Sequence, residues 1–160
     1  MNERELSPPT RPWPNAEFWV LCGVIACGLA VTLGAFAAHG LGPRLNELYG
    51  DVDKEIAGQK VPGPVKYLAD FKTAAEYQMT HGLALIALGL VAKHRRSALI
   101  RPAGWCLLWG IVLFSGSLYV LVLTGITKLG MITPIGGVLF LVGWGLFAGV
   151  ILSGEKTHDH

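Results

Sequence analysis

The stretch that decides the fold is PAGWCLLWGIVLFSGSLYVLVLTGITKLGMITPIGGVLFLVGWGLFAGVIL, residues 102–152, in which Lys128 is the only charged side chain. A bilayer core of about 30 Å is crossed by roughly 20 apolar residues in a helix that rises about 1.5 Å per residue. The stretch is long enough for two such helices, and the turn-forming residues 125–129 divide it into predicted spans at 102–124 and 130–152. It therefore predicts a helical hairpin that crosses a membrane twice.

Two more predicted spans precede this hairpin, at residues 18–40 and 73–92. Residues 18–43 contain no Asp, Glu, Lys or Arg. The A-x-A triplet at 35–37 is typical of a signal-peptide cleavage site, but the apolar run before it is too long and the leader carries acidic residues. We therefore expect the first span to remain in the protein.

The predicted fold is an all-α integral membrane four-helix bundle over residues 18–152, between a Pro-rich leader at 1–17 and a tail at 153–160. Only 15% of the 160 residues are charged, 52% are hydrophobic and the net charge is +2. This composition excludes an ordinary soluble enzyme and a disordered chain, and the sequence has no basic stripe for nucleic acid. It also shows no phosphate loop and no nucleophile-and-base pairing, so we do not expect an enzyme.

Charged residues predict the orientation of the spans. The short loop at 93–101 is strongly basic, with Lys93, Arg95, Arg96 and Arg101. The long loop at 42–72 has five basic and five acidic residues. Because short basic loops stay in the cytoplasm, we predict that both termini lie there (N-in/C-in) and that the long loop lies outside.

Two parts of the long loop have apolar residues at helical spacing. The first part has Leu41, Leu45, Leu48 and Tyr49, and the second has Val65, Tyr67, Leu68 and Phe71. Residues 58–64, which include a Pro-Gly-Pro triplet, separate the two parts. We expect two short amphipathic helices on the outer membrane interface, with a solvated loop as the alternative.

Polar side chains from all four predicted spans gather at one depth, in the outer half of the bundle. They are His39, Glu76, Tyr77, Gln78, His81, Ser115, Ser117, Tyr119 and Thr133. On the second span, Glu76, Thr80 and His81 share one helical face, and because a polar face in lipid is costly, we expect it to point into the bundle. Two interpretations stay open. The set forms either an outward-facing pocket with His39 and His81 as titratable members, or a group of hydrogen bonds that holds the helices together.

Four segments resemble one small family. They are GAFAAHGL (34–41), YQMTHGLAL (77–85), LFSGSLY (113–119) and LGMITPIGG (129–137). The chain is similar to the domain of unknown function 423 family, which includes relatives of the eukaryotic transmembrane protein 256. The resemblance implies a four-helix protein of the bacterial inner (plasma) membrane, with mitochondrial relatives and no established activity. The positions that match the family motifs are His39, Tyr77, Gln78, His81, Ser115, Ser117, Tyr119, Thr133 and Pro134.

The chain also departs from the family pattern. Ala37 stands where the first motif usually has glycine, and Glu76 falls at a position that varies in the family. The loop at 42–72 is longer than the resemblance implies, and the leader at 1–17 is additional. These two segments are where we expect features particular to this protein, such as a contact with a partner.

We expect a non-enzymatic membrane component, either an accessory or structural subunit of a larger membrane assembly or a small homo-oligomer. Its expected partners are the lipid bilayer and other membrane-protein subunits or copies of itself, with no nucleic acid, cofactor or metal. The alternative is a transporter of a small solute or protons through the polar pocket. A haem site at His39 and His81 is disfavoured because the two residues lie at different depths, and a metal site in the tail at 157–160 is disfavoured because chain ends fray.

Overall fold

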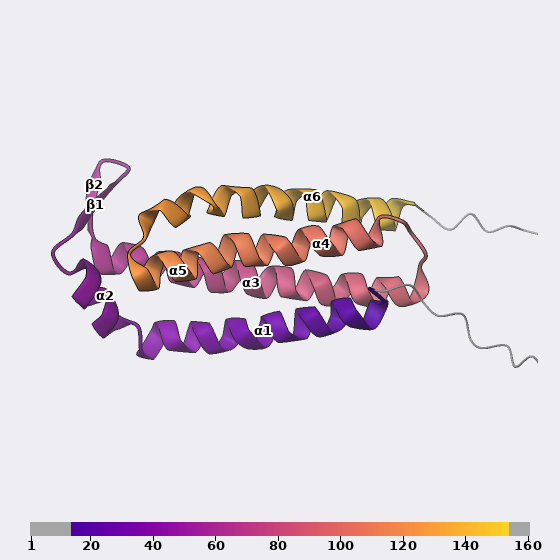
Figure 1. Cartoon of the computed structure of the whole chain (residues 1–160), viewed down its shortest axis with the longest axis horizontal. Helices are drawn as coiled ribbons and strands as arrows, with labels where there is room; N and C mark the ends of the chain where they lie inside the picture. The colour runs from indigo at the N-terminus through magenta and orange to yellow at the C-terminus, as the bar shows by residue number, and fades with distance from the viewer. Residues whose placement is uncertain (1–13, 154–160) are drawn as a thin grey trace, which may run out of the picture.

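The computed structural model describes residues 14–153, which are mostly helical. The long helices run side by side, and the two ends of the described chain lie at the same end of the molecule (Figure 1). The elements in chain order are α1 (Ala16–His39), α2 (Gly42–Tyr49), β1 (Asp53–Ile56), β2 (Gln59–Pro62), α3 (Gly63–His94), α4 (Ile100–Ile111), the π-helical turn η1 (Val112–Gly116), α5 (Ser117–Thr124), the 3-10 turn η2 (Thr127–Met131) and α6 (Thr133–Leu152).

Three helical segments of the described chain are long and apolar enough to cross a membrane, namely α1, Ile100–Thr124 and Thr127–Leu152. They coincide with the first, third and fourth predicted spans. Helix α3 has 32 residues, or about 48 Å, and includes the predicted span at 73–92. It is less apolar than the other three because Glu76, Gln78 and His81 fall in that segment.

Helix ends follow local sequence signals. The side chain of Asn15 caps α1 by accepting a hydrogen bond of 3.0 Å from the backbone N–H of Phe18. Helix α5 ends at Gly125, whose φ of +78° lies in the left-handed region that glycine adopts most easily. Pro134 lies in the first turn of α6, where backbone N–H groups have no partner within the helix. The N–H that proline lacks therefore costs the helix no hydrogen bond. These residues set the bounds of the helices before any tertiary contact is considered.

The loop at 42–72 has more structure than we predicted. Its first amphipathic part forms α2, but its second part is the beginning of α3 and continues into the bundle without a break. Between them, β1 and β2 pair as an antiparallel hairpin. Ala57 and Gly58 both have positive φ, at +49° and +78°, as the two-residue turn of a tight hairpin requires. The hairpin gave little signal in the sequence because its strands have four residues each and are mostly exposed.

Helix α2 packs on the end of the bundle through a cluster of buried apolar residues. The cluster contains Ala37, Leu41, Leu45, Tyr49, Tyr67, Phe71, Leu121 and Val122. The Tyr49 ring stacks on Tyr67, and the Tyr49 hydroxyl lies 3.1 Å from the carbonyl oxygens of Leu121 and Val122, to which it donates. Burial raises the pKa of the Tyr49 phenol above its usual value. The long loop is therefore anchored to α3 and α5.

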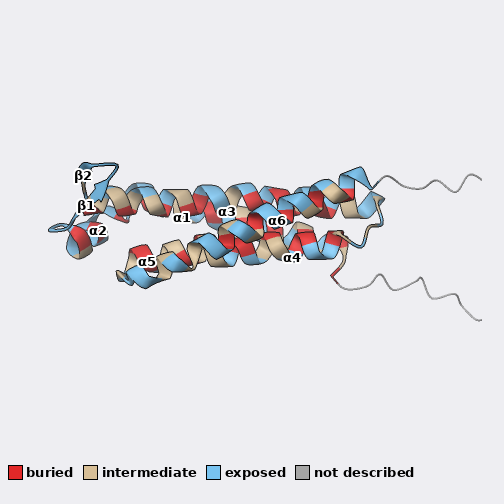
Figure 2. Cartoon of the chain, turned by 90° about the horizontal axis from the view of Figure 1, so that it is seen from above, coloured by how far each residue is buried: buried red, intermediate tan, exposed pale blue. Residues whose placement is uncertain are grey.

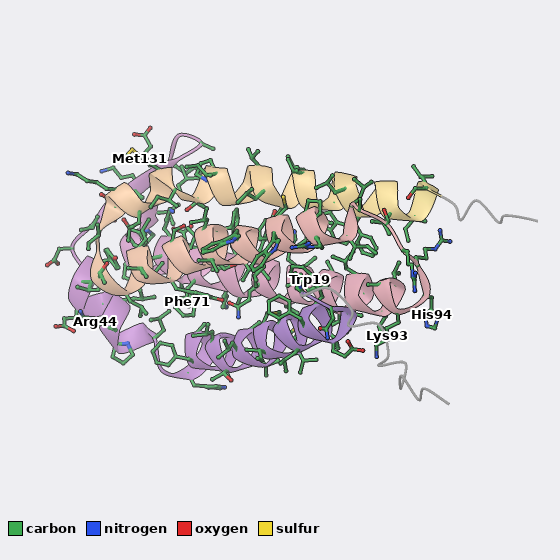
Figure 3. The ribbon with its side chains drawn as sticks, turned by 45° about the vertical axis from the view of Figure 1, so that its right-hand side comes forward. Trp19, Arg44, Phe71, Lys93, His94 and Met131 are labelled. Carbon is green, nitrogen blue, oxygen red and sulfur yellow. The ribbon has the colours of Figure 1, made fainter. Side chains whose placement is uncertain are left out.

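The helices associate as two close pairs, α1 with α3 and α4 with α6, and contacts between α3 and α4 join the pairs. Buried residues form stripes along the helices, and exposed residues cover their outer sides (Figure 2). Small residues allow the close approach of α1 and α3, since a Cβ atom on Gly23 would lie 2.5 Å from the carbonyl oxygen of Gly82. Trp19 is fully buried, and its indole lies against Gly104 of α4. Figure 3 shows Arg44 and Met131 at one end of the bundle and Lys93 and His94 at the other.

Candidate functional site

The predicted polar residues separate into groups that face different neighbours. Gln78 faces α1, and it is buried where the two helices meet. Its side-chain amide nitrogen donates a hydrogen bond of 2.9 Å to the carbonyl oxygen of Ala26. Gly23 and Gly82, one turn along the two helices, keep the backbones close enough for the side chain to reach across. Gln78 therefore acts as a hydrogen bond between α1 and α3.

His81 faces the opposite side of α3 and lies on an aromatic ring of α6. Its imidazole is almost parallel to the ring of Phe140, with a centroid distance of 3.3 Å and an interplanar angle of 12°. Its Nδ1 donates to the carbonyl oxygen of Tyr77 one turn earlier, at 2.7 Å. The Tyr77 ring in turn stacks on Phe114 at 4.5 Å. This arrangement fills the space between α3, η1 and α6 with rings, and the histidine is one of them.

A second polar contact joins η1 and α5 to the start of α6. The hydroxyls of Ser117 and Thr133 lie 2.8 Å apart, and Ser117 also donates to the carbonyl oxygen of Phe114 at 3.0 Å. The Ser117 proton is thus used on the carbonyl, so Thr133 donates to Ser117. The backbones are in direct contact here, because a Cβ atom on Gly136 would lie 2.4 Å from the backbone nitrogen of Phe114. The π-helical turn at 112–116 lies at this contact, and such turns often mark functional sites.

Two hydroxyls near this turn are buried without a hydrogen-bond partner among the described residues. They belong to Ser115, which is fully buried, and to Tyr119 one turn later. The Tyr119 ring packs against Phe71 of α3, with centroids 4.7 Å apart. Buried hydroxyls that make no hydrogen bond are uncommon and are usually destabilising. Ser115 and Tyr119 are therefore not part of the hydrogen-bonded contact that Ser117 and Thr133 make.

Two residues of the predicted polar set are exposed and do not lie inside the bundle. His39 is exposed at the end of α1, and Glu76 is exposed on the outer side of α3. Thr80 is also exposed, and its hydroxyl donates to the carbonyl oxygen of Glu76. The prediction that the face with Glu76 and Thr80 points into the bundle is wrong, because glycines and alanines on other faces of α3 make the contacts with α1 and α4. Only His81 and part of the Tyr77 ring turn inward.

An open groove of about 360 Å³ runs along the surface between α1 and α3. It is lined by Ala30, Ala75, Glu76, Met79 and Thr80. Three of these residues are apolar, and Glu76 and Thr80 of α3 supply a carboxylate and a hydroxyl. The groove opens to the surroundings of the protein and not to the space around His81.

The described residues offer no obvious place for a bound metal. Among residues 14–153, no group of three or more His, Cys, Asp and Glu side chains is close enough to hold a metal ion. His39 is exposed at the helix end while His81 is buried against Phe140, so the two face different surroundings. The histidine-containing tail at 157–160 and most of the leader at 1–17 lie outside the described residues.

Comparison with known proteins matches residues 33–137 to the family model described as "Protein of unknown function (DUF423)". The chain belongs to the DUF423 family. Its relatives include a UPF0382 membrane protein of Staphylococcus saprophyticus, 43% identical over 128 residues that cover 80% of this chain and 91% of the relative. A UPF0382 membrane protein of Bacillus subtilis is 40% identical over 129 residues, covering 80% of this chain and 90% of the relative. No solved structure matches the chain.

Family membership agrees with the fold. The relatives are named membrane proteins, and residues 14–153 of this chain include three helical segments that are apolar and long enough to cross a membrane. The chain is therefore a membrane protein of an uncharacterised family. The matched segment includes every predicted site residue, from His39 to Thr133, so the resemblance seen in the four sequence motifs is confirmed. The family name carries no activity that could be assigned to those residues.

Sequence reasoning missed the aromatic partners of the polar residues. Phe114 and Phe140 contact Tyr77 and His81 directly, but a search for polar groups does not select phenylalanine in an apolar span. The distance of each residue from the outer end of its helix could have indicated these contacts. Phe140 lies eight residues into α6, and His81 lies at a similar distance below the predicted outer end of its own span. The surface groove had no sequence signal, since it depends on how α1 and α3 pack.

Proposed function

We propose that this DUF423 protein is a non-enzymatic component of a membrane assembly, located in the bacterial inner membrane. We also propose that it crosses the membrane four times with both termini in the cytoplasm. Helix α3 packs along α1 and α4, so a bilayer that surrounds those two helices also surrounds much of α3. Residues 73–92 would then be the fourth span, although polar residues lower its hydropathy.

The distribution of charge supports this orientation. The last turn of α3 and the loop after it carry Lys93, Arg95 and Arg96, none of which forms an ion pair with another described residue. Arg95 donates to the carbonyl oxygen of Ile151 near the end of α6, at 3.2 Å. At the opposite end, basic residues alternate with acidic ones, and two ion pairs form there, Arg44 with Glu47 and Lys66 with Asp70. The end of the bundle whose basic residues form no ion pairs with described residues is therefore the end that we expect in the cytoplasm.

The observation that carries the proposal is the exposure of Glu76. The neighbouring ring of Tyr77 lies 6.2 Å from that of Phe140, which is the eighth residue of α6. The ring of His81, five residues after Glu76, lies closer to Phe140, at 3.3 Å. At about 1.5 Å per residue, Glu76 therefore lies only about 3–5 Å below the start of α6. An acidic side chain facing lipid near mid-depth costs about 2.5–3.5 kcal/mol or more, with a smaller cost nearer the interface.

Other outer faces of the bundle are suited to lipid. On α1 the exposed residues include Leu21, Val24 and Leu29, and on α6 they include Val138 and Leu141. The outer face of α3 differs from these because the exposed Glu76 lies at the edge of the expected lipid region and the exposed Thr80 lies one turn deeper. We infer that another protein surface covers this face of α3. A subunit that makes such a contact fits the geometry better than a protein that works alone.

The transporter alternative has less support from the contacts around His81. A path for solute or protons through one chain would have to pass the rings of Tyr77, Phe114 and Phe140, which pack against one another and against His81. The groove that contains Glu76 lies on the surface of the bundle and would become a path only if a second chain closed it. Transport would thus also depend on an assembly.

The test is the native size of the protein. The tagged chain is expressed at its natural level, extracted with a mild detergent or in native lipid discs, and its mass is measured without the lipid. We expect a mass well above the 17.1 kDa of the chain. A monomer, found both in discs and in detergent at concentrations like those in the membrane, would contradict the proposal. A chain of known monomeric state, prepared in the same way, controls for loss of partners during extraction.

A further inference from the structure

The end of the bundle where α3 leads into α4 carries an excess of positive charge, and Lys93 marks this end in Figure 3. The described lysine and arginine side chains here are Lys93, Arg95, Arg96 and Arg101. Within residues 14–153, the acidic side chain at this end is Glu17, in the first turn of α1. Arg95 donates to the carbonyl oxygen of Ile151. The other three cations are exposed and form no ion pair with another described residue, so they are available to an anion.

Arg101 begins a line of exposed residues along α4, which we call the α4 stripe. Trp105 and Trp109 follow it at intervals of four residues, so the three side chains lie on one side of the helix. The two indoles are 37% and 52% exposed. The centroid of the Trp105 ring lies 5.4 Å from that of Trp19 and 5.9 Å from that of Phe18, so α1 holds this indole in place.

The spacing of the α4 stripe matches the layers of a bilayer. At about 1.5 Å per residue, Trp105 lies about 6 Å from Arg101 along the helix, and Trp109 lies about 12 Å from it. Each headgroup layer of a bilayer is about 5–8 Å thick. If the Arg101 guanidinium lies among lipid phosphates, Trp105 lies at the boundary of the hydrocarbon, where tryptophan is enriched, and Trp109 lies beside the first part of an acyl chain.

We propose that the α4 stripe, together with Arg96, binds an anionic phospholipid. The lipid phosphate accepts hydrogen bonds from the guanidinium groups of Arg96 and Arg101, and one acyl chain lies along Trp105 and Trp109. Lys93, in the last turn of α3, adds to the attraction. Basic clusters beside a membrane span attract anionic headgroups in this way.

The charges also say which class of lipid the site prefers. A zwitterionic lipid has the same phosphate, but its ammonium group would be repelled by the same three cations. The opposite end of the bundle is a natural contrast, because the segment at 42–72 has five basic and five acidic residues and offers an anion no net attraction. The site lies within one chain, so the inference does not depend on the proposed assembly or on the orientation in the membrane.

Native mass spectrometry of the full chain in a neutral detergent tests the proposal. Binding is measured for phosphatidylglycerol and for phosphatidylcholine with the same acyl chains, and phosphatidylglycerol is expected to bind more tightly. A basic residue beside an anionic membrane is worth about fivefold in affinity, so Arg101→Gln is expected to weaken binding of phosphatidylglycerol about fivefold, and Arg96→Gln with Arg101→Gln about twenty-fivefold.

The matched control is Lys60→Gln with Lys72→Gln. It removes the same charge from two exposed residues at the opposite end of the bundle, neither of which forms an ion pair with a described residue. This control is expected to leave the affinity for phosphatidylglycerol unchanged. An equal loss in the control would mean that the lipid responds to the net charge of the protein and not to the α4 stripe. Thermal unfolding without added lipid checks that each variant is folded.

Two other results would overturn the proposal. Equal binding of the two lipids would exclude selection by headgroup charge. Displacement of phosphatidylglycerol by inorganic phosphate at a similar concentration would mean that the ligand is a free anion, and that the acyl chain makes no contact with the two indoles.

Fluorescence in a bilayer tests the position of the acyl chain separately. The full chain is placed in phosphatidylcholine bilayers that contain a small fraction of either phosphatidylglycerol or phosphatidylcholine with brominated acyl chains, since bromine quenches nearby tryptophans. Brominated phosphatidylglycerol is expected to quench more strongly. This difference is expected to disappear in Trp105→Phe with Trp109→Phe, because Trp144 on α6 meets both lipids alike. A difference that persists in this variant would place the anionic lipid elsewhere on the protein.

Discussion

The close approach of α1 and α3 predicts that Gly23→Ala destabilises the protein. A Cβ atom at this position would lie 2.5 Å from the carbonyl oxygen of Gly82 and 2.8 Å from the backbone nitrogen of Ile86. Because both atoms belong to the backbone, no change of side-chain rotamer relieves the clash. Contact distances of about 3.5 Å between non-bonded atoms then require the helices to separate by about 1 Å.

The cost follows from two terms. Overpacking of a well-packed contact costs about 1–3 kcal/mol. The same separation stretches the hydrogen bond between Gln78 and Ala26, which is now 2.9 Å long, and its loss costs about 0.6 kcal/mol more. Gly28→Ala is the matched control, because Gly28 lies on the same helix and a Cβ there meets nothing within 4 Å. Both changes gain the same helix propensity, so the difference between them is expected to be about 2–3.5 kcal/mol.

The measurement is the unfolding of both variants in the same detergent, by heat or by titration with a denaturing detergent. Gly23→Ala is expected to unfold well before the unmodified protein, and Gly28→Ala is expected to be at least as stable as it. Equal stability of the two variants would show that α1 and α3 do not approach this closely at Gly23, and the packing argument for this helix pair would fail.

Three further predictions concern the polar groups. Ser117→Ala and Thr133→Val each break the same 2.8 Å hydrogen bond, so a double-mutant cycle should give a coupling of about 0.6 kcal/mol. Ser115→Ala removes a buried hydroxyl that lacks a partner in the described chain, so stability should stay the same or rise by up to about 1 kcal/mol. Burial raises the pKa of Tyr49, so the neutral phenol stabilises the docked α2. This stabilisation is fully present at any pH below the pKa of an unfolded tyrosine, which is about 10. It is lost as the pH rises through the higher pKa of Tyr49 in the folded protein. Hydrogen exchange in α2 should then accelerate.

Each of these predictions has its own control. Additive effects in the cycle would mean that Ser117 and Thr133 do not bond to each other. A loss of stability in Ser115→Ala as large as that in Ser117→Ala would mean that Ser115 has a partner that contributes to folding. Tyr49→Phe cannot ionise, so the protection of the α2 amides in this variant, measured relative to their intrinsic exchange rate at each pH, should not change near this pKa. An unchanged pH dependence would assign it to another group.

Most of the helical architecture could be predicted because it depends on local composition. Apolar runs of about 20 residues, with charges and turn residues between them, place α1, α4 to α5 and α6 almost to the residue. The hairpin of β1 and β2 could not be found in this way. Its eight residues form no apolar alternation, and its tight turn includes Ala57, a residue type not expected at positive φ.

The candidate site shows the same division more sharply. That the polar residues share one depth is a prediction from counting residues along each span, and the structure brings only some of them into contact, such as Ser117 with Thr133. Which way each side chain points does not follow from counting. Gln78 faces α1 and His81 faces α6, although they are three residues apart on one helix.

The sequence by itself determined that this is a helical membrane protein, which helices it has and to which family it belongs, because hydropathy, turn residues and motifs are properties of short segments. Only the tertiary structure decided the faces of those helices. The glycines of α1 and α3 let two backbones meet, and that contact leaves Glu76 exposed on the outer side of α3. Close packing is short-ranged and depends on both partners, so a pattern in one helix cannot specify it.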